Sequence, residues 1–270
     1  LVVVFKATQV VNFAHGEMFM FGGFFAYSFH AMLGVPYVLS LFMAVACAFV
    51  VGIITDRIAF RPLMKSQTLV SVLLAMVGLS FIFKGIARSA WGSSGHHIAF
   101  PPLISPEPIM FLGLMVMSQE LVVMAAAIIV MVAFALFFKL TRAGKFMQAT
   151  ANNPKAATLV GLRIDRVYMY TFGVGAAVAG AAAVLMAPIT LLSPDIGFVL
   201  FVKGFAAAVL GGLTSIPGAI AGGIILGLLE KMAAGYIHTG LEEVSAFVVI
   251  MFAMVFLLTG LFGLGAVRRV

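Results

Sequence analysis

Charged side chains are scarce in this sequence. They make up 9% of its 270 residues, whereas an average soluble domain has about 25%. A soluble protein of this length needs enough polar residues to cover its surface, so the composition excludes an ordinary water-soluble globule. Hydrophobic residues make up 63% of the chain, and its mean hydropathy is +1.20. Most of the chain is therefore expected to lie in lipid.

Cysteine is nearly absent, and so are the motifs of several enzyme classes. Cys47 is the only cysteine, which excludes an internal disulfide and a cysteine cluster for a metal ion. Neither His15-x-Glu17 nor His96-His97 has the H-E-x-x-H pattern, and no nucleophile accompanies them. No G-x-x-x-x-G-K-[ST] motif or dinucleotide fingerprint is present. We therefore expect no catalytic residue, no bound metal and no cofactor.

Long apolar runs bounded by Gly, Pro and charge are abundant instead. They predict an all-α, polytopic transmembrane bundle that forms one domain over residues 1–270. About eight membrane segments are expected near 13–33, 37–55, 69–88, 119–138, 167–191, 198–213, 219–235 and 244–262. The apolar stretch before Asn12 would be only about 16 Å long as a helix, so we expect it to be the end of a truncated span. The short pair within 198–235 is either two tilted crossings or a re-entrant hairpin.

Basic residues give the expected orientation. Eleven of the sixteen lysines and arginines fall on one side of an alternating topology, and cytoplasmic loops carry such an excess. That side, which includes the C-terminus, is therefore expected to be cytoplasmic. These basic residues are Arg57, Arg61, Lys65, Lys139, Arg142, Lys145, Lys155, Arg163, Arg166, Arg268 and Arg269. The opposite side holds the external loop 89–118 and Asp195. Lys84 and Arg88 are exceptions, which we expect to snorkel at the outer interface.

The basic residues form no stripe interleaved with aromatics, so no nucleic acid is expected as a partner.

The first stretch that could carry a function places an amide, an imidazole and a carboxylate at the start of an apolar helix. These are Asn12, His15 and Glu17. An ionised Glu inside a bilayer is costly, so Glu17 is paired, neutral, near an interface or facing a wet cavity. Two interpretations stay open. The cluster is either part of a translocation pathway or gate, or a set of side chains that cap backbone groups.

The second stretch is the basic segment 139–166. Its apolar residues predict a short amphipathic helix with an apolar face too large to leave in water. They are Ala156, Ala157, Leu159, Val160, Leu162 and Ile164. The segment either docks on a partner protein or lies on the inner membrane surface, attracted by anionic lipid.

The third stretch is a glycine-rich hairpin that precedes Glu230. The spacings Gly218-x-x-x-Gly222 and Gly223-x-x-x-Gly227 predict close packing of helices. The alternative is a site lined by exposed backbone at a broken helix. In that case the pathway would include four residues of the hairpin: Gly211, Gly212, Pro217 and Gly218.

Several motifs in the same order resemble one known family. They cover nearly the whole chain and comprise Asn12–Glu17 (NFAHGE), Ala151–Gly161 (ANNPKAATLVG), Phe205–Leu213 (FAAAVLGGL), Ser215–Glu230 and Gly260–Gly263 (GLFG). With these motifs the chain resembles the LivH-type permease subunit of the high-affinity branched-chain amino acid ABC transporter family.

The resemblance implies an importer in the bacterial inner membrane. Such an importer has two cytoplasmic ATPase subunits, two paralogous permease subunits and an external binding protein that delivers leucine, isoleucine or valine. This chain would be one permease, and ATP hydrolysis would occur only on partner chains. The basic segment is similar to the E-A-A-x-x-x-G coupling pattern of ABC permeases. Lys155 stands where that pattern has Glu, Asn153 precedes it by two positions, and Ala156, Ala157 and Gly161 keep the spacing.

Two other functions stay open at this stage. Relatives that carry urea or short amides share much of the same pattern. A self-contained channel or secondary transporter would instead use Glu17 or Glu230 as a coupling carboxylate. An intramembrane enzyme is disfavoured because no nucleophile or metal-binding set accompanies His15 and Glu17.

Overall fold

The computed structural model describes residues 1–63, 69–92, 97–103, 108–111, 114–256 and 260–262. The chain divides into two compact parts. The central part comprises residues 13–197, and the terminal part combines residues 1–12 with residues 198–270.

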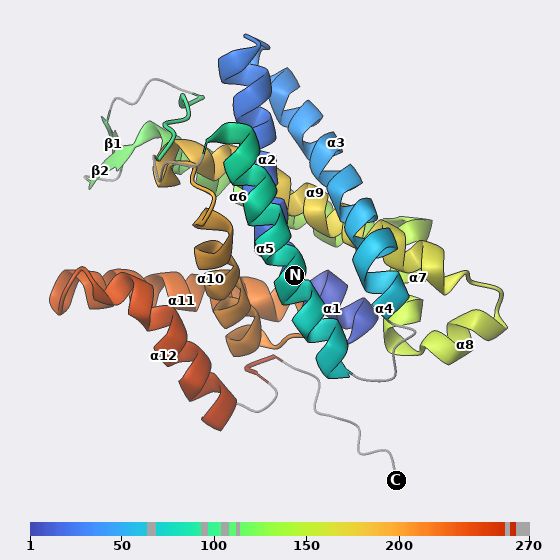
Figure 1. Ribbon diagram of the computed structural model, residues 1–270. Helices are drawn as coiled ribbons and strands as arrows, with labels where there is room; N and C mark the ends of the chain where they lie inside the picture. Colours follow the sequence, from blue (N-terminus) through green and yellow to red (C-terminus); the bar gives the residue numbers. More distant parts are fainter. Residues whose placement is uncertain (64–68, 93–96, 104–107, 112–113, 257–259, 263–270) are drawn as a thin grey trace. The chain divides into compact units, whose positions relative to one another are not determined.

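Three helices form the core of the central part (Figure 1). They are α2 (His15–Tyr27), α3 (Tyr37–Thr55) and α9 (Ile164–Thr190). α3 packs along α9, and α2 packs against both. Glycines allow this close approach: a Cβ added at Gly52 would lie 2.5 Å from the carbonyl oxygen of Phe172, and Gly22 contacts the backbone of Gly180. Small residues at such crossings let membrane helices pack tightly.

Short elements extend this core. α2 continues into a π-helix, η1 (Ser28–Met32), and α3 continues through a second one, η2 (Asp56–Phe60), into α4 (Arg61–Leu63). α5 (Leu69–Trp91) leads to an antiparallel hairpin of β1 (Pro108–Phe111) and β2 (Leu114–Met117). α6 (Ser118–Leu140), α7 (Arg142–Asn152) and α8 (Pro154–Leu159) precede α9.

The terminal part contains four helices within its described residues. They are α1 (Val2–Thr8), α10 (Ile196–Gly211), α11 (Ile216–Tyr236) and α12 (Leu241–Phe256), and α10 begins at the end of the central part. Small and medium apolar residues form a core between the last three helices: Ala206, Leu226 and Ala246 are almost fully buried.

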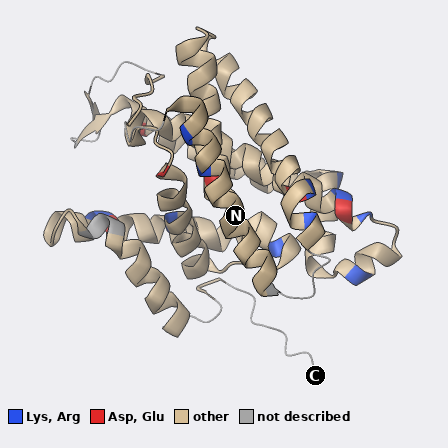
Figure 2. Cartoon of the chain, viewed as in Figure 1, with Lys and Arg blue, Asp and Glu red and all other residues tan. Residues whose placement is uncertain are grey.

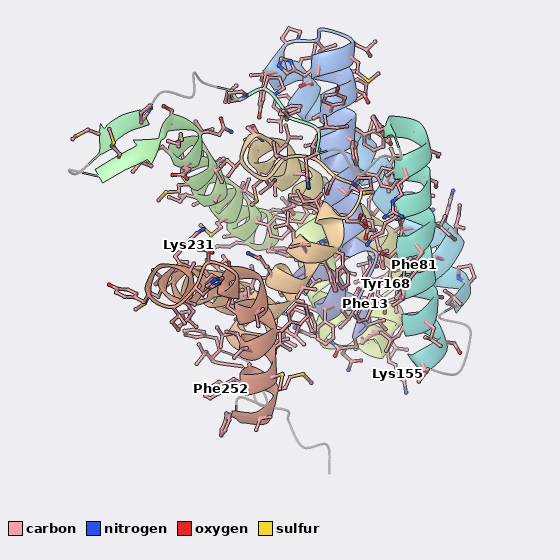
Figure 3. The ribbon with its side chains drawn as sticks, turned by 60° about the vertical axis from the view of Figure 1, so that its left-hand side comes forward. Phe13, Phe81, Lys155, Tyr168, Lys231 and Phe252 are labelled. Atoms are coloured by element: carbon pink, nitrogen blue, oxygen red, sulfur yellow. The ribbon has the colours of Figure 1, made fainter. Side chains whose placement is uncertain are left out.

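Each of the eight predicted segments contains a helix within its described residues, which confirms a polytopic helical bundle. Among the described residues, five helices are long and apolar enough to cross a membrane: Tyr37–Leu63, Val70–Trp91, Ser118–Leu140, Ile164–Thr190 and Ile216–Tyr236. α10 and α12 are apolar but have 16 residues each, or about 24 Å against a core of about 30 Å. Large apolar side chains such as Phe81 and Phe252 project outward from their helices (Figure 3). Such side chains suit a surface that faces lipid.

Candidate functional site

Glu17, the acidic residue of the predicted pathway, is deeply buried. It lies in the first turn of α2, and its side chain is 1% exposed. The hydroxyl Oγ of Ser80 donates a hydrogen bond to its Oε1 over 2.8 Å, and Lys84 Nζ lies 3.9 Å from the same oxygen. Both partners come from α5, where residues four apart share one face. The buried carboxyl group thus has partners at Oε1, whereas its Oε2 has no hydrogen-bond partner among the described residues.

Asp195 continues this row of charges toward the end of α5. Its Oδ1 lies 3.4 Å from Lys84 Nζ, and Arg88 Nη2 donates to both carboxylate oxygens over 3.1 and 3.0 Å. Burial alone would raise the pKa of Asp195, but the hydrogen bonds and positive charges of Arg88 and Lys84 outweigh it and lower that pKa. We call Glu17, Ser80, Lys84, Arg88 and Asp195 the Glu17 cluster.

Lys84 and Arg88, which were expected to snorkel at the outer interface, both form ion pairs with Asp195. Ser80 was not among the predicted site residues. Ser80, Lys84 and Arg88 are spaced four residues apart, which places them on one face of a helix. This spacing could have indicated that Ser80 belongs with the two basic residues.

Gly197 closes the other side of Glu17. A Cβ added at Gly197 would lie 2.6 Å from the carbonyl oxygen of Gly16 and 2.7 Å from Glu17 Oε2. Gly197 is the last residue of the central part and the second residue of α10, so its backbone lies against the carboxylate. The partial positive charge of a helix N-terminus favours such an anion.

The other predicted residues of this stretch are also buried. His15 begins α2 and is 9% exposed, and Asn12 is 3% exposed. Asn12 belongs to the terminal part, whereas His15 and Glu17 belong to the central part. The capping position of α2 is occupied by Ala14 and has no side-chain cap. The burial of the Glu17 side chain is therefore better explained by its contacts with α5 than by a role in capping the start of α2.

The glycine-rich hairpin is a tight crossing of α10 and α11. Gly211 and Gly218 contact each other backbone to backbone, so that a Cβ on either would collide with the other's carbonyl group. A Cβ at Gly222 would contact the carbonyl oxygen of Ala207 and lie 2.8 Å from the nitrogen of Gly211. The predicted close packing is therefore confirmed for Gly218 and Gly222, but not for Gly223 and Gly227, because a Cβ at Gly227 would meet no atom within 4 Å.

The turn within this hairpin is held by local hydrogen bonds and by a distant segment. Gly212 adopts a φ of 108°, which favours glycine. Ser215 caps α11 by accepting a hydrogen bond from Gly218, and Pro217 lies in the first turn. The amides of Leu261 and Phe262 donate to the last carbonyl groups of α10 over 2.8 and 3.0 Å. The end of α10 therefore has partners for its carbonyl groups.

A second ion pair lies in the terminal part. Lys203 Nζ on α10 lies 3.0 Å from Glu230 Oε2 on α11, and the Glu230 side chain is 9% exposed. Within the described residues, no group of three or more His, Cys, Asp or Glu side chains is arranged to hold a metal ion.

The short amphipathic helix predicted within the coupling segment 139–166 is interrupted: the segment contains the end of α6, all of α7 and α8, and the start of α9. Asn153 caps α8 by accepting from the amide of Ala156 over 3.1 Å, and Pro154 follows it. α8 ends at Leu159, and Gly161 has a φ of 85° in the turn toward α9. The expected amphipathic face is only partly formed, because Ile164 already belongs to α9.

The exposed residues of this segment are both basic and apolar. Lys155 projects away from the bundle (Figure 3), Ala156 is also exposed, and Ala157 is buried. Leu159 and Val160 are 89% and 78% exposed. Lys and Arg gather around α4, α7, α8 and the start of α9 (Figure 2). Such an exposed apolar pair next to positive charge is typical of a contact surface.

Comparison with known proteins gives consistent matches over the whole length. The profile of the family described as "Branched-chain amino acid transport system / permease component" matches residues 1–259. The chain is 31% identical to the high-affinity branched-chain amino acid transport permease LivH of Salmonella typhimurium, over 99% of the chain and 90% of that protein. It is 30% identical to BraD of Pseudomonas aeruginosa, over 99% and 91%.

A more distant relative comes from an archaeon. The probable LivH permease of Methanocaldococcus jannaschii is 26% identical over 88% of the chain and 76% of that protein. No solved structure matches the chain. Together with the buried charges and crossing glycines of a helical membrane bundle, the matches show that this multi-pass membrane protein belongs to the permease-component family of branched-chain amino acid transport systems.

Proposed function

We propose that this chain is one permease subunit of an ABC importer that carries leucine, isoleucine and valine across the bacterial inner membrane. The observation that carries the proposal is the family match over residues 1–259, combined with an apolar helical bundle. The partners would be two cytoplasmic ATPases, a second, paralogous permease and an external binding protein. The basic side and the C-terminus would face the cytoplasm.

α8 and its flanking residues would couple ATP hydrolysis to transport. The exposed pair Leu159 and Val160 supports this role, because it offers an apolar contact at the end of a short capped helix. Closure of the ATPases would move this segment and so shift the helices between outward-open and inward-open states. Asn153 would fix the start of α8, and Gly161 its end.

Gly161 provides the sharpest test of the coupling role. An added Cβ there meets no atom within 4 Å, yet the φ of 85° disfavours a branched side chain. Gly161→Val should therefore reorient α8 without disturbing the bundle. Gly161→Asn is the matched control, because Asn tolerates a positive φ. Both variants should reach the membrane in normal amounts.

Uptake of labelled leucine and the rate of ATP hydrolysis would be measured on the assembled complex in proteoliposomes. We expect Gly161→Val to lose most uptake and Gly161→Asn to keep it. Unchanged uptake in Gly161→Val would show that this segment does not couple the two processes.

The pathway or its gate would involve Asn12, His15 and Glu17, with the turn from Gly211 to Gly218 as a second element. The ion pairs of the Glu17 cluster support a gating role, because they link α2 and α5 to the start of α10 and would have to rearrange if these elements separate. Glu17→Gln keeps an acceptor for Ser80 and removes the charge that faces Lys84. We expect it to slow uptake with little change in thermal stability, and a wild-type rate would refute the role.

Mass spectrometry of the gently extracted complex would test the assembly itself. Two ATPases and a second permease that remain bound would support the importer. A chain that is isolated alone and moves solute in liposomes with an ion gradient but no ATP would refute it. Competition by urea and short amides against labelled leucine would test the substrate class.

A further inference from the structure

A basic pocket lies beside α8, where two membrane-spanning helices end. It is open to the surface, has a volume of about 580 Å³, and is formed by the end of the Tyr37–Leu63 span, the α8–α9 turn and the first turns of α9. Ligand pockets usually measure about 300–1,000 Å³, so this one is large enough for a small molecule or a lipid headgroup. Four of its lining residues are arginines: Arg57, Arg61, Arg163 and Arg166.

One of these arginines is held in place by the protein. Arg61 Nη2 lies 3.1 Å from Asp56 Oδ2 and donates to the carbonyl oxygen of Asp165 over 2.8 Å. Asp56 is 1% exposed, so the pair anchors the guanidinium group on a buried carboxylate. Arg57, Arg163 and Arg166 are exposed. After allowance for Asp56 and Asp165, two positive charges remain in excess around the pocket.

We propose that this pocket binds the phosphate group of an anionic phospholipid from the leaflet that faces the basic side. Guanidinium groups match phosphate oxygens in geometry and charge. The first turn of α9 lines the pocket as well, and a helix N-terminus favours an anion. Basic pockets between membrane helices are a known form of lipid headgroup site.

Two further observations favour a lipid over a partner protein. The pocket lies at the ends of spans, which is the depth of lipid phosphates, and Leu162, Ile164 and Met169 add apolar atoms to its lining. An amphiphile needs both kinds of surface. The exposed apolar pair Leu159 and Val160 is not part of the lining, although the lining residues Thr158 and Leu162 lie on either side of it in the sequence.

Native mass spectrometry of the purified full-length chain would test the site. The chain in detergent would be titrated with phosphatidylglycerol, phosphatidylcholine or glycerol 3-phosphate. We expect one tightly bound phosphatidylglycerol, at least tenfold weaker binding of phosphatidylcholine, and no displacement by equimolar glycerol 3-phosphate.

Two double variants separate this pocket from general basic charge. Arg163→Gln with Arg166→Gln removes two exposed charges from the pocket. Arg142→Gln with Lys145→Gln removes two exposed charges from α7, outside it. A membrane-surface charge contributes about 1 kcal/mol, so the first variant should bind phosphatidylglycerol about 30-fold more weakly, whereas the second should change less than about threefold.

Three results would overturn the proposal. Equal losses in both double variants would indicate nonspecific attraction between the basic surface and the lipid. Displacement by equimolar glycerol 3-phosphate would indicate a site for a soluble phosphate compound. Unchanged lipid binding in Arg163→Gln with Arg166→Gln, accompanied by loss of the ATPase subunits from the purified complex, would make the pocket a protein contact.

Discussion

Gly197→Ala adds one methyl group beside the buried Glu17, where it would be too close to two atoms. The new Cβ would lie 2.6 Å from the carbonyl oxygen of Gly16 and 2.7 Å from Glu17 Oε2, whereas real Cβ contacts stay above 3.0 Å. The start of α10 or of α2 must therefore shift by at least about 0.4 Å. Glu17 is packed between Ser80 and Gly197, so such a shift also disturbs its hydrogen bond.

The size of the effect follows from the cost of overpacking, which is about 1–3 kcal/mol for an extra methylene group in a packed interior. For a domain of 150–250 residues, 1 kcal/mol corresponds to about 2–4 °C, so the melting temperature should fall by roughly 2–12 °C. Gly78→Ala in α5 is the matched control. A Cβ there meets no atom within 4 Å, and Ala is favoured over Gly in a helix by about 1 kcal/mol.

The only tryptophan of the chain makes the assay simple. Trp91 stacks on Phe24 with ring centroids 5.1 Å apart and donates to Ser28 Oγ, so its fluorescence reports on the packing of α5 against α2. Thermal unfolding in detergent should show a lower melting temperature for Gly197→Ala and an equal or higher one for Gly78→Ala. If Gly197→Ala melts at the wild-type temperature, Gly197 does not lie against Gly16 and Glu17, and the proposed packing is refuted.

Two further predictions concern the ion pairs. Lys203→Met leaves the buried carboxylate of Glu230 without its partner, so the free energy of unfolding should fall by about 3–5 kcal/mol. Lys203→Met with Glu230→Met should recover most of this loss. A double variant no more stable than the single one would contradict the pairing. Arg88→Gln removes a partner of Asp195, whose pKa is lowered from 3.8 in the folded protein. Asp195 therefore stabilises the fold above pH 3.8, and the stabilisation is lost as pH falls through its lower folded pKa. The melting temperature of Arg88→Gln should lie below that of the wild type at pH 6, and the gap should close below pH 3.8; a gap independent of pH would refute the assignment.

The helices of this fold could be predicted from sequence because long apolar runs have few structural alternatives in lipid. Their ends were less predictable. The span that begins at Tyr37 was expected to stop at residue 55, before Asp56 and Arg57, yet it continues to Leu63. The structure explains the difference, because Asp56 is buried and paired with Arg61 through a π-helix.

The partners of the candidate site were the least predictable feature. Glu17 was recognisable as a costly charge in an apolar run, but Ser80 lies 63 positions away. Asp195 and Arg88 are 107 positions apart. Neither periodicity nor spacing reports contacts between distant helices. In the glycine-rich hairpin, the pattern of small residues predicted a close contact correctly. Gly211 and Gly218 belong to consecutive helices, so their contact is local in the sequence.

The division of the chain has a consequence for its biosynthesis. The central part is continuous in sequence, whereas α1 contacts α11, which is synthesised more than 200 residues later. At about 5–20 residues per second, the ribosome needs roughly 10–40 s to proceed from the end of α1 (Val2–Thr8) to the start of α11 (Ile216–Tyr236). During that interval α1 has emerged but its partner helix has not. The newly made protein therefore depends on the membrane insertion machinery or on lipid to hold its first helix until the last ones arrive.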